Sequence, residues 1–486
     1  MKKLTLILLI ILLLFSCAEK IIDEPLKPQS SDENETTIEE FYPLPKDLNF
    51  NGAEIRFYQI EDPNGYMFIN PDEITGDIVY DAVYTSNSKV QETLNVTFTY
   101  IEEPYEQYDR KLKSSMFAAE DSFDVVMCQQ WVVTPSVLNN MFINLKDAPY
   151  IDLNKPWWAT DYIKEMTIGN DRLYFVSGDI SLNVIRQMSC VYYNKQVYEN
   201  NGFGEPDDMY TMVLDGKWTM DKLDEMVRVM YIDLNGDGQF DDGDQYGTGV
   251  ITYNLTDHFT YDAGVRASKR NSNGIPELIM NNEHTINFTE KLYKLFYENP
   301  GVRIFPPHAD SNNIVIPNKF MNNELLFDFG WFHTSEFLRD MNADYGIIPY
   351  PKYDEVQPTY LSLVHDSAFV YCIPVTCNKF EAVCAIFEAM AYEGYKTNYP
   401  AYYEIALKAK YMRDANEVTF KIIDMIYENA TTDFIYVYNY ALDNMGLIMR
   451  ELMTGKSDNF VSAYTKKESG VEKKLQELID AYLEIG

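Results

Sequence analysis

The stretch "AEIRFY" at residues 53–58 is the first of three short segments rich in β-branched and aromatic residues, followed by "NVTFTY" at residues 95–100 and "FDVVMC" at residues 123–128. This composition predicts three strands. Between the first two, residues 77–94 show the apolar period of a helix. Strands alternating with helices at this spacing predict an α/β unit with a largely parallel sheet. Ligands of such sheets bind beyond the carboxyl ends of the strands.

A second α/β region is predicted from "SCVYYN" at residues 189–194 onward. Residues 217–231 have helical spacing, with Thr219 in the position of an N-cap. The glycines and β-branched residues of "QYGTGV" at residues 245–250 predict a strand.

The C-terminal part is predicted to change from strands to helices. Residues 321–376 contain strands separated by turns. Asn378, with Glu381 three positions later, resembles a capping box that opens a helix ended by Gly394. The remaining tail reads as helical, with a last helix near residues 471–483.

Length, charge and cysteine content limit the function. A chain of 486 residues favours two lobes over one, and a net charge of -35 argues against nucleic acid or an anionic lipid surface as a partner. Apart from Cys17, the cysteines are an odd number without a close pair, which predicts small buried thiols and leaves room for one disulfide. They are Cys128, Cys190, Cys372, Cys377 and Cys384.

The N-terminus predicts export. A short basic start precedes twelve residues at 4–15 that are almost all Leu and Ile. As a helix they reach only about 18 Å, too short to span a bilayer, so they read as the core of a signal peptide. The segment "LFSC" ending at Cys17 resembles the lipobox of bacterial lipoproteins, although Phe15 is bulkier than usual. The resemblance implies a signal peptide at residues 1–16 and diacylglycerol on Cys17; ordinary secretion with nearby cleavage is the alternative. Residues 17–47 would form a flexible acidic leash.

The stretch "DLNGDGQFDDGD" at residues 233–244 has the oxygen spacing of a twelve-residue calcium loop, with Gly238 at the sharp turn. The alternative is an acidic turn held by Asx hydrogen bonds. A single loop followed by a strand predicts a structural ion rather than a calcium sensor. The predicted ligands are Asp233, Asn235, Asp237, Gln239, Asp241 and Asp244.

Four blocks in order resemble the extracellular solute-binding proteins, family 1, which serve carbohydrate ABC importers: "FDVVMCQQW", "RLYFVSGDISLNVIRQMSCVYYNKQVYENNGF", "FMNNELLFDFGWF" and "DYGIIPYPKYDE". The resemblance implies a type II periplasmic-binding-protein-like fold of two α/β lobes, each a mainly parallel sheet flanked by helices, joined by hinge strands. The resemblance also implies a monomer that binds carbohydrate without enzyme activity. Its partners would be the permease subunits of the importer, and its membrane contact would be a lipid anchor.

The same resemblance divides the chain. It implies a first lobe at residues 48–177 with a return at 303–367, and a second lobe at 178–302 that contains the calcium-like loop. The helical part at residues 368–486 would belong mainly to the second lobe.

Sugars present apolar C–H faces and a rim of hydroxyls, so a site needs aromatic plates and carboxylate or amide acceptors. Adjacent tryptophans cannot both face one way in an extended segment, so only one of Trp157 and Trp158 is expected to line the site. For each candidate, packing in the core or a local hydrogen bond is the alternative role. The predicted ligand-binding residues are Gln130, Trp131, Trp157, Trp158, Asp179, Asp257, Trp331, His365 and Asp366, with His258 beside Asp257 as a further candidate.

Two other classes of protein fit parts of the sequence. A secreted glycoside hydrolase needs only two carboxylates about 5 to 9 Å apart, and 75 acidic residues always offer candidates. A calcium-dependent carbohydrate adhesion protein would use the loop at residues 233–244 for docking. The sequence contains no nucleophile elbow, zinc-binding helix or P-loop, and the order of the four blocks favours a binding protein.

Overall fold

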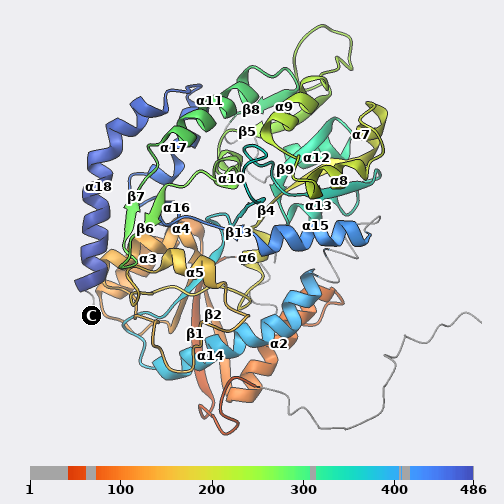
Figure 1. Cartoon of the computed structure of the whole chain (residues 1–486). Coiled ribbons are helices and arrows are strands. Elements are labelled where there is room, and N and C mark those ends of the chain that lie inside the picture. Colours follow the sequence, from red (N-terminus) through yellow and green to blue (C-terminus); the bar gives the residue numbers. More distant parts are fainter. Residues whose placement is uncertain (1–41, 62–72, 307–313, 404–406, 408–415, 485–486) are drawn as a thin grey trace, which may run out of the picture. The chain divides into compact units, whose positions relative to one another are not determined.

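The computed structural model describes residues 42–61, 73–306, 314–403, 407 and 416–484. The predicted signal peptide, Cys17 and most of the leash lie outside the described residues. Residues 43–486 form one compact unit that contains two sheets of four and five strands (Figure 1). No described helix is both long enough and apolar enough to cross a membrane.

The first sheet has the strand order β12-β3-β1-β2. Strands β1 (Ala53–Ile60), β2 (Val96–Glu103) and β3 (Val125–Gln129) are parallel, and β12 (Phe369–Cys372) joins β3 in the antiparallel direction. Helix α2 (Ile78–Leu94) connects β1 to β2, and it begins where the side chain of Asp77 accepts hydrogen bonds from two backbone N–H groups. The predicted N-terminal α/β unit is confirmed.

The second sheet has the strand order β10-β4-β9-β5-β8. Its members are β4 (Ser189–Asn194), β5 (Tyr246–Ile251), β8 (Val302–Phe305), β9 (Leu325–Trp331) and β10 (Tyr345–Ile348). Strands β8, β5 and β9 are parallel, and β4 is antiparallel to β9. Every residue of β4, β5 and β9 is buried, which explains why none of these strands shows an alternating polar and apolar pattern.

Helices cover both sheets, and short strands and turns complete the chain. The remaining elements are α3 (Tyr105–Phe117), α4 (Gln130–Val133), η1 (Thr134–Asn139), α5 (Thr160–Met166), α6 (Asn183–Arg186), α7 (Lys195–Asn200), α8 (Asp208–Leu214), α9 (Met220–Arg228), α10 (Asn254–Asp262), β6 (Ser268–Arg270), β7 (Pro276–Leu278), α11 (Glu283–Tyr297), α12 (Val315–Met321), α13 (Thr334–Leu338), β11 (Ser362–Leu363), α14 (Phe380–Glu393), η2 (Gly394–Asn398), α15 (Glu417–Glu428), β13 (Ala430–Thr431), α16 (Phe434–Val437), η4 (Met445–Leu447), α17 (Ile448–Thr454) and α18 (Phe460–Glu484).

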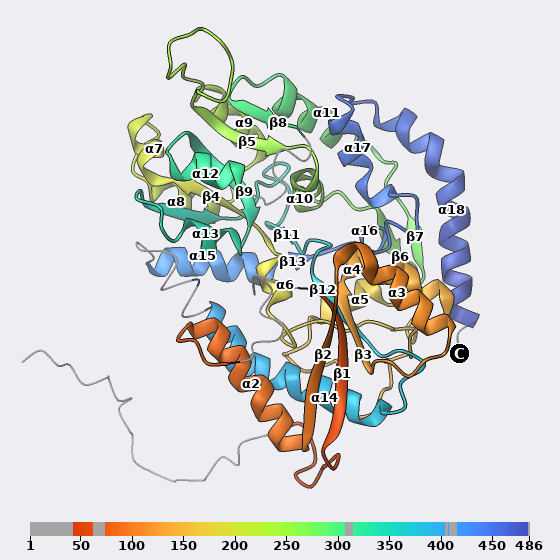
Figure 2. The same cartoon turned by 180° about the vertical axis from the view of Figure 1, so that it is seen from behind.

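The predicted assignment of residues 303–367 to the first lobe is corrected by the strand pairing. Strands β8, β9 and β10 all belong to the second sheet, where β9 lies between β4 and β5. The apolar run of β9 needs partners on both edges and cover on both faces, and the second sheet supplies them. The C-terminal part also divides: β12 joins the first sheet and α14 packs against α2, while α15 packs against β10 (Figures 1 and 2).

Two chain segments that connect the sheets run side by side. One leads from Val176 to β4. Val176 forms a β-bridge with Tyr371 of β12 in the first sheet. The other leads from β11 to β12, and the N–H of His365 donates to the carbonyl of Gln187 on the first segment at 3.0 Å. Met188 also bridges to a residue of the second segment. The predicted two-sheet fold with connecting segments is therefore present.

Several local predictions can be compared with the structure. Thr219 caps α9 by accepting a hydrogen bond from Lys222 N–H, and β5 follows the acidic loop, both as predicted. The capping box at Asn378 is wrong, because α14 begins after Lys379 without a side-chain cap and Asn378 instead donates to Asp121. The last helix, α18, begins at residue 460, about three turns earlier than the predicted start at residue 471.

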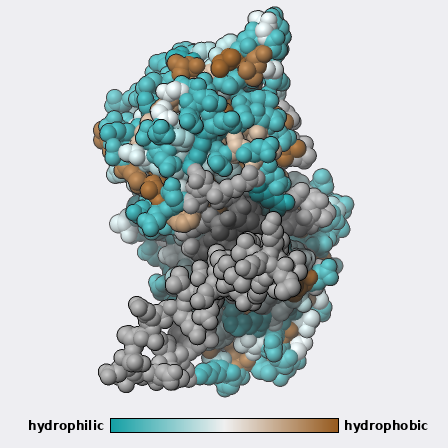
Figure 3. Space-filling view, turned by 90° about the vertical axis from the view of Figure 1, so that its right-hand side faces the viewer, coloured by the Kyte–Doolittle hydropathy of each residue, from teal (hydrophilic) through white to brown (hydrophobic). Residues whose placement is uncertain are grey.

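The five cysteines within the described residues are all buried and free, so the structure supports the prediction of small buried thiols and contains no disulfide among them. The face shown in Figure 3 is mostly hydrophilic, with small separate apolar patches over its described atoms. This agrees with the dispersed exposed apolar residues along the sequence, such as Leu214, Val229 and Val356.

Candidate ligand-binding site

Three aromatic side chains lie in a row. Two of them follow strands of the first sheet, and the third comes from the C-terminal part. Tyr105 follows β2, and Trp131 follows β3. The ring centroids of Tyr105 and Trp131 are 5.6 Å apart, and those of Trp131 and Tyr440 are 5.2 Å apart. Tyr105 is 47% exposed and Tyr440 is 42% exposed. This aromatic row (Tyr105, Trp131, Tyr440) therefore offers adjoining ring surface to a ligand.

An arginine and two carboxylates form an ion triad (Arg450, Asp257, Asp366) beside a further ring. Arg450 Nε lies 2.8 and 2.7 Å from the two carboxylate oxygens of Asp257, and Nη2 also bonds to Asp257. Nη2 is 3.9 Å from Asp366 Oδ2. The guanidinium carbon lies 4.5 Å from the ring centroid of Tyr253, which follows β5 and is 42% exposed. Burial raises the pKa of Asp257 to about 7, against the effect of Arg450.

Charged and ring side chains of the ion triad region affect the pKa values of the tyrosines in the aromatic row. The pKa of Tyr105 is raised to about 12, mainly by burial and in smaller part by neighbours that include Tyr253 and Asp366. Burial also raises the pKa of Tyr440, and the same two side chains add to that effect. Burial raises the pKa of Asp366 itself, although Arg450 opposes this. Residues from both sheets and from the C-terminal helices thus meet at one place, beyond the carboxyl ends of β3, β5 and β9.

Trp331, the last residue of β9, lies among three histidines. Its ring stacks on His333 at 5.2 Å and makes edge contacts with His258 at 5.3 Å and His365 at 5.5 Å. Trp331 is only 6% exposed, yet its Nε1 has no hydrogen-bond partner among the described residues. The Nε2 atom of His365 is likewise buried without a partner in that part of the chain. Buried polar atoms are rarely left unpaired, so these nitrogens point to a water or a ligand.

The protonation of these histidines follows from their surroundings. Burial lowers the pKa of His258 and of His365 well below the ordinary range, and it lowers the pKa of His333 to about 4. His365 Nδ1 accepts a hydrogen bond from Ser367 N–H at 3.2 Å, so the neutral ring carries its proton on Nε2. Nδ1 also lies 3.3 Å from Asp366 Oδ1, but the low pKa argues against a charged pair. His365 Nε2 and Trp331 Nε1 are therefore both donors.

Trp157 and Trp158 have a different environment from Trp131 and Trp331. Both are buried, and both indole N–H groups donate to one carboxylate, that of Glu388 on α14, at 3.2 and 3.0 Å. Residues 153–157 form turns and a bend rather than an extended strand, so both indole N–H groups can reach the same acceptor. The expected place of one of these rings in the site stays a prediction. Burial raises the pKa of Glu388 to about 7. These contacts join the loop to α14 within the first lobe.

Two other predicted residues, Asp179 and Gln130, are not part of the ion triad or the aromatic row. Asp179 is next to Gly394, Tyr399 and Tyr427, and burial raises its pKa to about 8. Gln130 is fully buried and accepts a hydrogen bond from Tyr162. Their roles in ligand binding stay predictions.

Sequence reasoning placed Trp131, Asp257, Trp331, His365 and Asp366 in the site, and the structure brings these five residues to one region. It missed four residues, namely Tyr105, Tyr253, Tyr440 and Arg450. Two of them follow strands directly, within "EEPY" after β2 and "ITYN" after β5. The rule that ligands bind beyond the carboxyl ends of strands would have found these two. Arg450 and Tyr440 come from the C-terminal part and have no local signal.

The calcium-like loop folds on its own hydrogen bonds. The two carboxylate oxygens of Asp233 accept from the N–H groups of Gly236 and Gly238, which have φ of 73° and 72° and so need glycine. The Asp244 side chain is buried, and its Oδ1 has no hydrogen-bond partner among the described residues. Within the described chain, no group of three or more His, Cys, Asp or Glu side chains is arranged to hold a metal ion. Calcium binding therefore stays a prediction.

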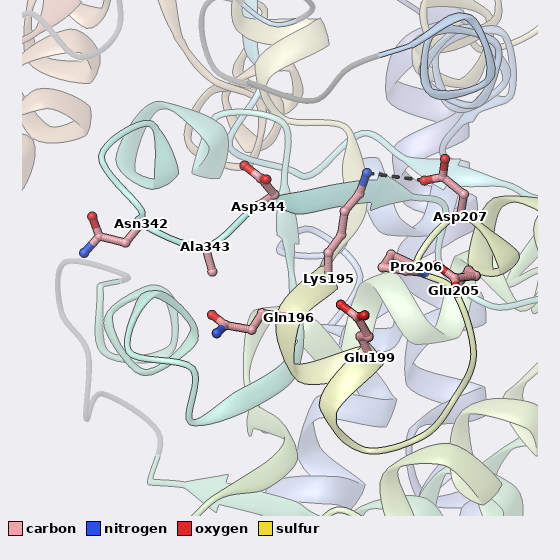
Figure 4. Close-up of a pocket in the computed structure, with 9 residues that line it drawn as sticks. All are labelled: Lys195, Gln196, Glu199, Glu205, Pro206, Asp207, Asn342, Ala343 and Asp344. Atoms are coloured by element: carbon pink, nitrogen blue, oxygen red, sulfur yellow. Dashed lines mark hydrogen bonds and ion pairs between the residues drawn. The ribbon is translucent and has the colours of Figure 1, made fainter.

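A separate pocket of about 490 Å³ lies at the end of the second sheet opposite to the carboxyl end of β9 (Figure 4). Lys195 follows β4, which runs antiparallel to β9, so the pocket lies away from Trp331. Its lining contains four carboxylates and Lys195, which pairs with Asp207 at 3.4 Å, but no aromatic ring. It lacks the ring surface that a sugar needs. The lining residues are those labelled in Figure 4.

No family model matches the sequence, and no curated protein matches it either. Solved structures with the same fold do match. One is an ABC substrate-binding protein of Listeria monocytogenes in complex with cycloalternan, with 13% identity, a TM-score of 0.56, and coverage of 87% of this chain and 99% of that one.

Two further matches have similar scores. UgpB of Mycobacterium tuberculosis in complex with glycerophosphocholine has 15% identity and a TM-score of 0.55, covering 89% of this chain and 100% of its own. The GacH receptor of Streptomyces glaucescens, whose structures include a complex with acarbose, has 12% identity and a TM-score of 0.53, covering 89% and 98%. The predicted fold class is confirmed: the chain has the fold of the ABC substrate-binding proteins.

Proposed function

We propose that the chain is the substrate-binding component of an ABC importer, and that it captures an extracellular carbohydrate, most simply an oligosaccharide, for a membrane permease. The observation that carries the proposal is the meeting of the aromatic row with the ion triad beyond the strand ends. Rings bind the C–H faces of sugars, while carboxylate, guanidinium and indole N–H groups bind their hydroxyls. Binding would draw the two lobes together about the connecting segments, as in other hinge proteins.

A calorimetric titration of the purified chain with mono- and oligosaccharides tests this function. We expect saturable binding of at least one sugar by the wild-type chain. Trp131→Ala should weaken that binding about 10- to 100-fold, because it removes the central ring of the aromatic row. Trp157→Phe is the matched control and should bind as the wild type does. Equal affinity of the wild type and Trp131→Ala would place the ligand elsewhere.

We also propose that the protein binds without catalysis. The named solved structures are binding proteins, which supports a non-enzymatic role by fold alone. The experiment is an incubation of the bound oligosaccharide with excess protein, followed by chromatography. Intact sugar is the expected result, and cleavage products that disappear in Asp257→Asn or Asp366→Asn would favour a glycoside hydrolase instead.

Calcium remains a proposed structural ion of the loop at residues 233–244. The regular oxygen spacing and the unpaired Oδ1 of buried Asp244 support it. Calcium should raise the melting temperature of the apo chain, and Asp233→Asn with Asp237→Asn should abolish the increase. Sugar affinity should be the same with calcium and with EDTA, since the loop lies outside the aromatic row and the ion triad. An effect of calcium on sugar binding alone would contradict a structural role.

We further propose that the mature chain is a monomer tethered at the extracytoplasmic membrane face through a lipid on Cys17. The resemblance of "LFSC" to a lipobox supports this. Labelling of cells with a fatty acid analogue should mark the wild type and not Cys17→Ala. Size-exclusion chromatography with light scattering should give the mass of one chain. A chain that partitions into the aqueous phase unlabelled would instead be secreted.

A further inference from the structure

The charges around Asp366 restrict the class of sugar that the site can accept. Asp366 is 4% exposed and comes from the segment that connects β11 to β12. Besides burial, its carboxylate raises the pKa of four tyrosines, and its backbone N–H donates to the hydroxyl of one of them, Tyr436, at 3.2 Å. The four tyrosines are Tyr105, Tyr162, Tyr436 and Tyr440.

Arg450 is already occupied by carboxylates. Its Nε and Nη2 atoms both bond to Asp257, and Nη2 is 3.9 Å from Asp366. One face of the guanidinium lies against Tyr253 at 4.5 Å. A carboxylate on a ligand could therefore pair with Arg450 only by displacing a carboxylate that is buried with it, which is costly.

The histidines near the site do not supply positive charge. His258, His333 and His365 are kept neutral by burial, and Arg450 lowers the pKa of His258 and His365 further. The ion triad thus brings one guanidinium and two carboxyl groups together, and no histidine adds a positive charge to it. An anionic ligand group placed among the surrounding rings would meet Asp366 in a poorly hydrated environment, where like charges repel strongly.

We propose, resting on the carbohydrate function above, that Asp366 makes the site selective for neutral and amino sugars and excludes sugars that carry a uronic acid. Asp366 accepts hydroxyl or ammonium hydrogens of the ligand. The buried donors Trp331 Nε1 and His365 Nε2 bind ligand oxygen atoms. Arg450 holds Asp257 and Tyr253 in position rather than binding an acidic group.

A glycan array read at pH 8 tests the selectivity with the wild-type chain alone. The array carries sets of matched glycans that differ at one sugar, which is neutral, amino-bearing or a uronic acid. We expect retention on neutral and amino glycans, with uronate glycans bound at least about tenfold more weakly. Equal or stronger retention on the uronate members would overturn the selectivity and leave carbohydrate binding intact. Retention on no glycan at all would count against the proposed function and this inference together.

Asp366→Asn then tests the residue. The isosteric amide should bring the affinities for uronate and neutral glycans within about threefold of each other. Asp340→Asn is the control, because it removes the same charge from a side chain that is 86% exposed, and it should keep the discrimination of the wild type. If Asp366→Asn binds neutral sugars and still rejects uronates, Asp366 is not the selective group. If it does not fold, the wild-type array result decides the selectivity.

Discussion

Two pairs of tryptophans in this chain have opposite relations to the residues around them. Trp157 and Trp158 are buried and share one acceptor, Glu388, so their N–H groups are satisfied within the protein. Trp131 stands between two half-exposed tyrosines, and Trp331 is buried with an N–H that has no partner in the described chain. Both indole N–H groups of the first pair have an acceptor within the protein, whereas that of Trp331 has none in the described chain, which supports its proposed role in ligand binding.

Removing the shared acceptor is expected to have the largest effect. Glu388→Ala leaves two buried indole N–H groups unpaired, which should lower the free energy of unfolding by about 3 kcal/mol. Urea denaturation measures this loss. Glu381→Ala on the exposed side of the same helix is the control and should change stability by less than about 0.5 kcal/mol. A loss below about 1 kcal/mol for Glu388→Ala would contradict a structural role of the first pair.

The two regions should respond oppositely to pH. The pKa of His333 is lowered to about 4, so the unfolded chain binds the proton more readily between about pH 6.5 and 4, and stability is lost as the pH falls through this window. The pKa of Glu388 is raised to about 7, so its contribution is present below about pH 4.5 and is lost as the pH rises to 7.

Two variants separate these contributions in urea titrations across pH 4 to 8. Relative to the wild type, His333→Asn should recover about 2 kcal/mol at pH 4 and little at pH 7, allowing for the partial exposure of the ring. Glu388→Gln should remove the loss of stability that the wild type shows as the pH rises from 4.5 to 7. Parallel curves for all three proteins would show that neither group is coupled to folding.

A matched pair of substitutions, one in each pair of tryptophans, should have the smallest effect on stability and separate the two roles most clearly. Trp158→Phe removes an N–H that has an acceptor and should cost about 1 kcal/mol of stability with unchanged sugar affinity. Trp331→Phe removes an unpaired N–H, so stability should change by less than about 0.5 kcal/mol while sugar affinity falls about fivefold. Denaturation and calorimetric titration of both variants measure this. The reverse pattern would exchange the roles of the two tryptophans.

The parts of the fold that sequence could predict are those with local patterns. The parallel strands of the first sheet, α2 with its Asp77 cap, and the Thr219 cap of α9 all depend on near neighbours in the chain. The sheet membership of β8, β9 and β10 depends on pairing across long stretches of sequence, and residues 303–367 were therefore assigned to the wrong lobe. An apolar strand such as β9 fits either sheet by composition.

The candidate site shows the same limit. Trp131 and Trp331 could be predicted because each follows or ends a strand, and Asp366 because it belongs to a segment between sheets. Arg450 could not, because its position depends on how α17 packs against α10, about 190 residues away. The shared acceptor of Trp157 and Trp158 could not be predicted either, because it lies on α14, about 230 residues away, and no local sequence pattern identifies it.

The most direct test of the central claim is a calorimetric titration of Trp131→Ala, beside the wild type, with the oligosaccharide that binds the wild type best. The account predicts a loss of affinity of about 10- to 100-fold with the melting temperature of the free protein little changed, because Trp131 is the central ring of the aromatic row. An unchanged affinity in the folded variant would contradict the claim that this row binds the sugar.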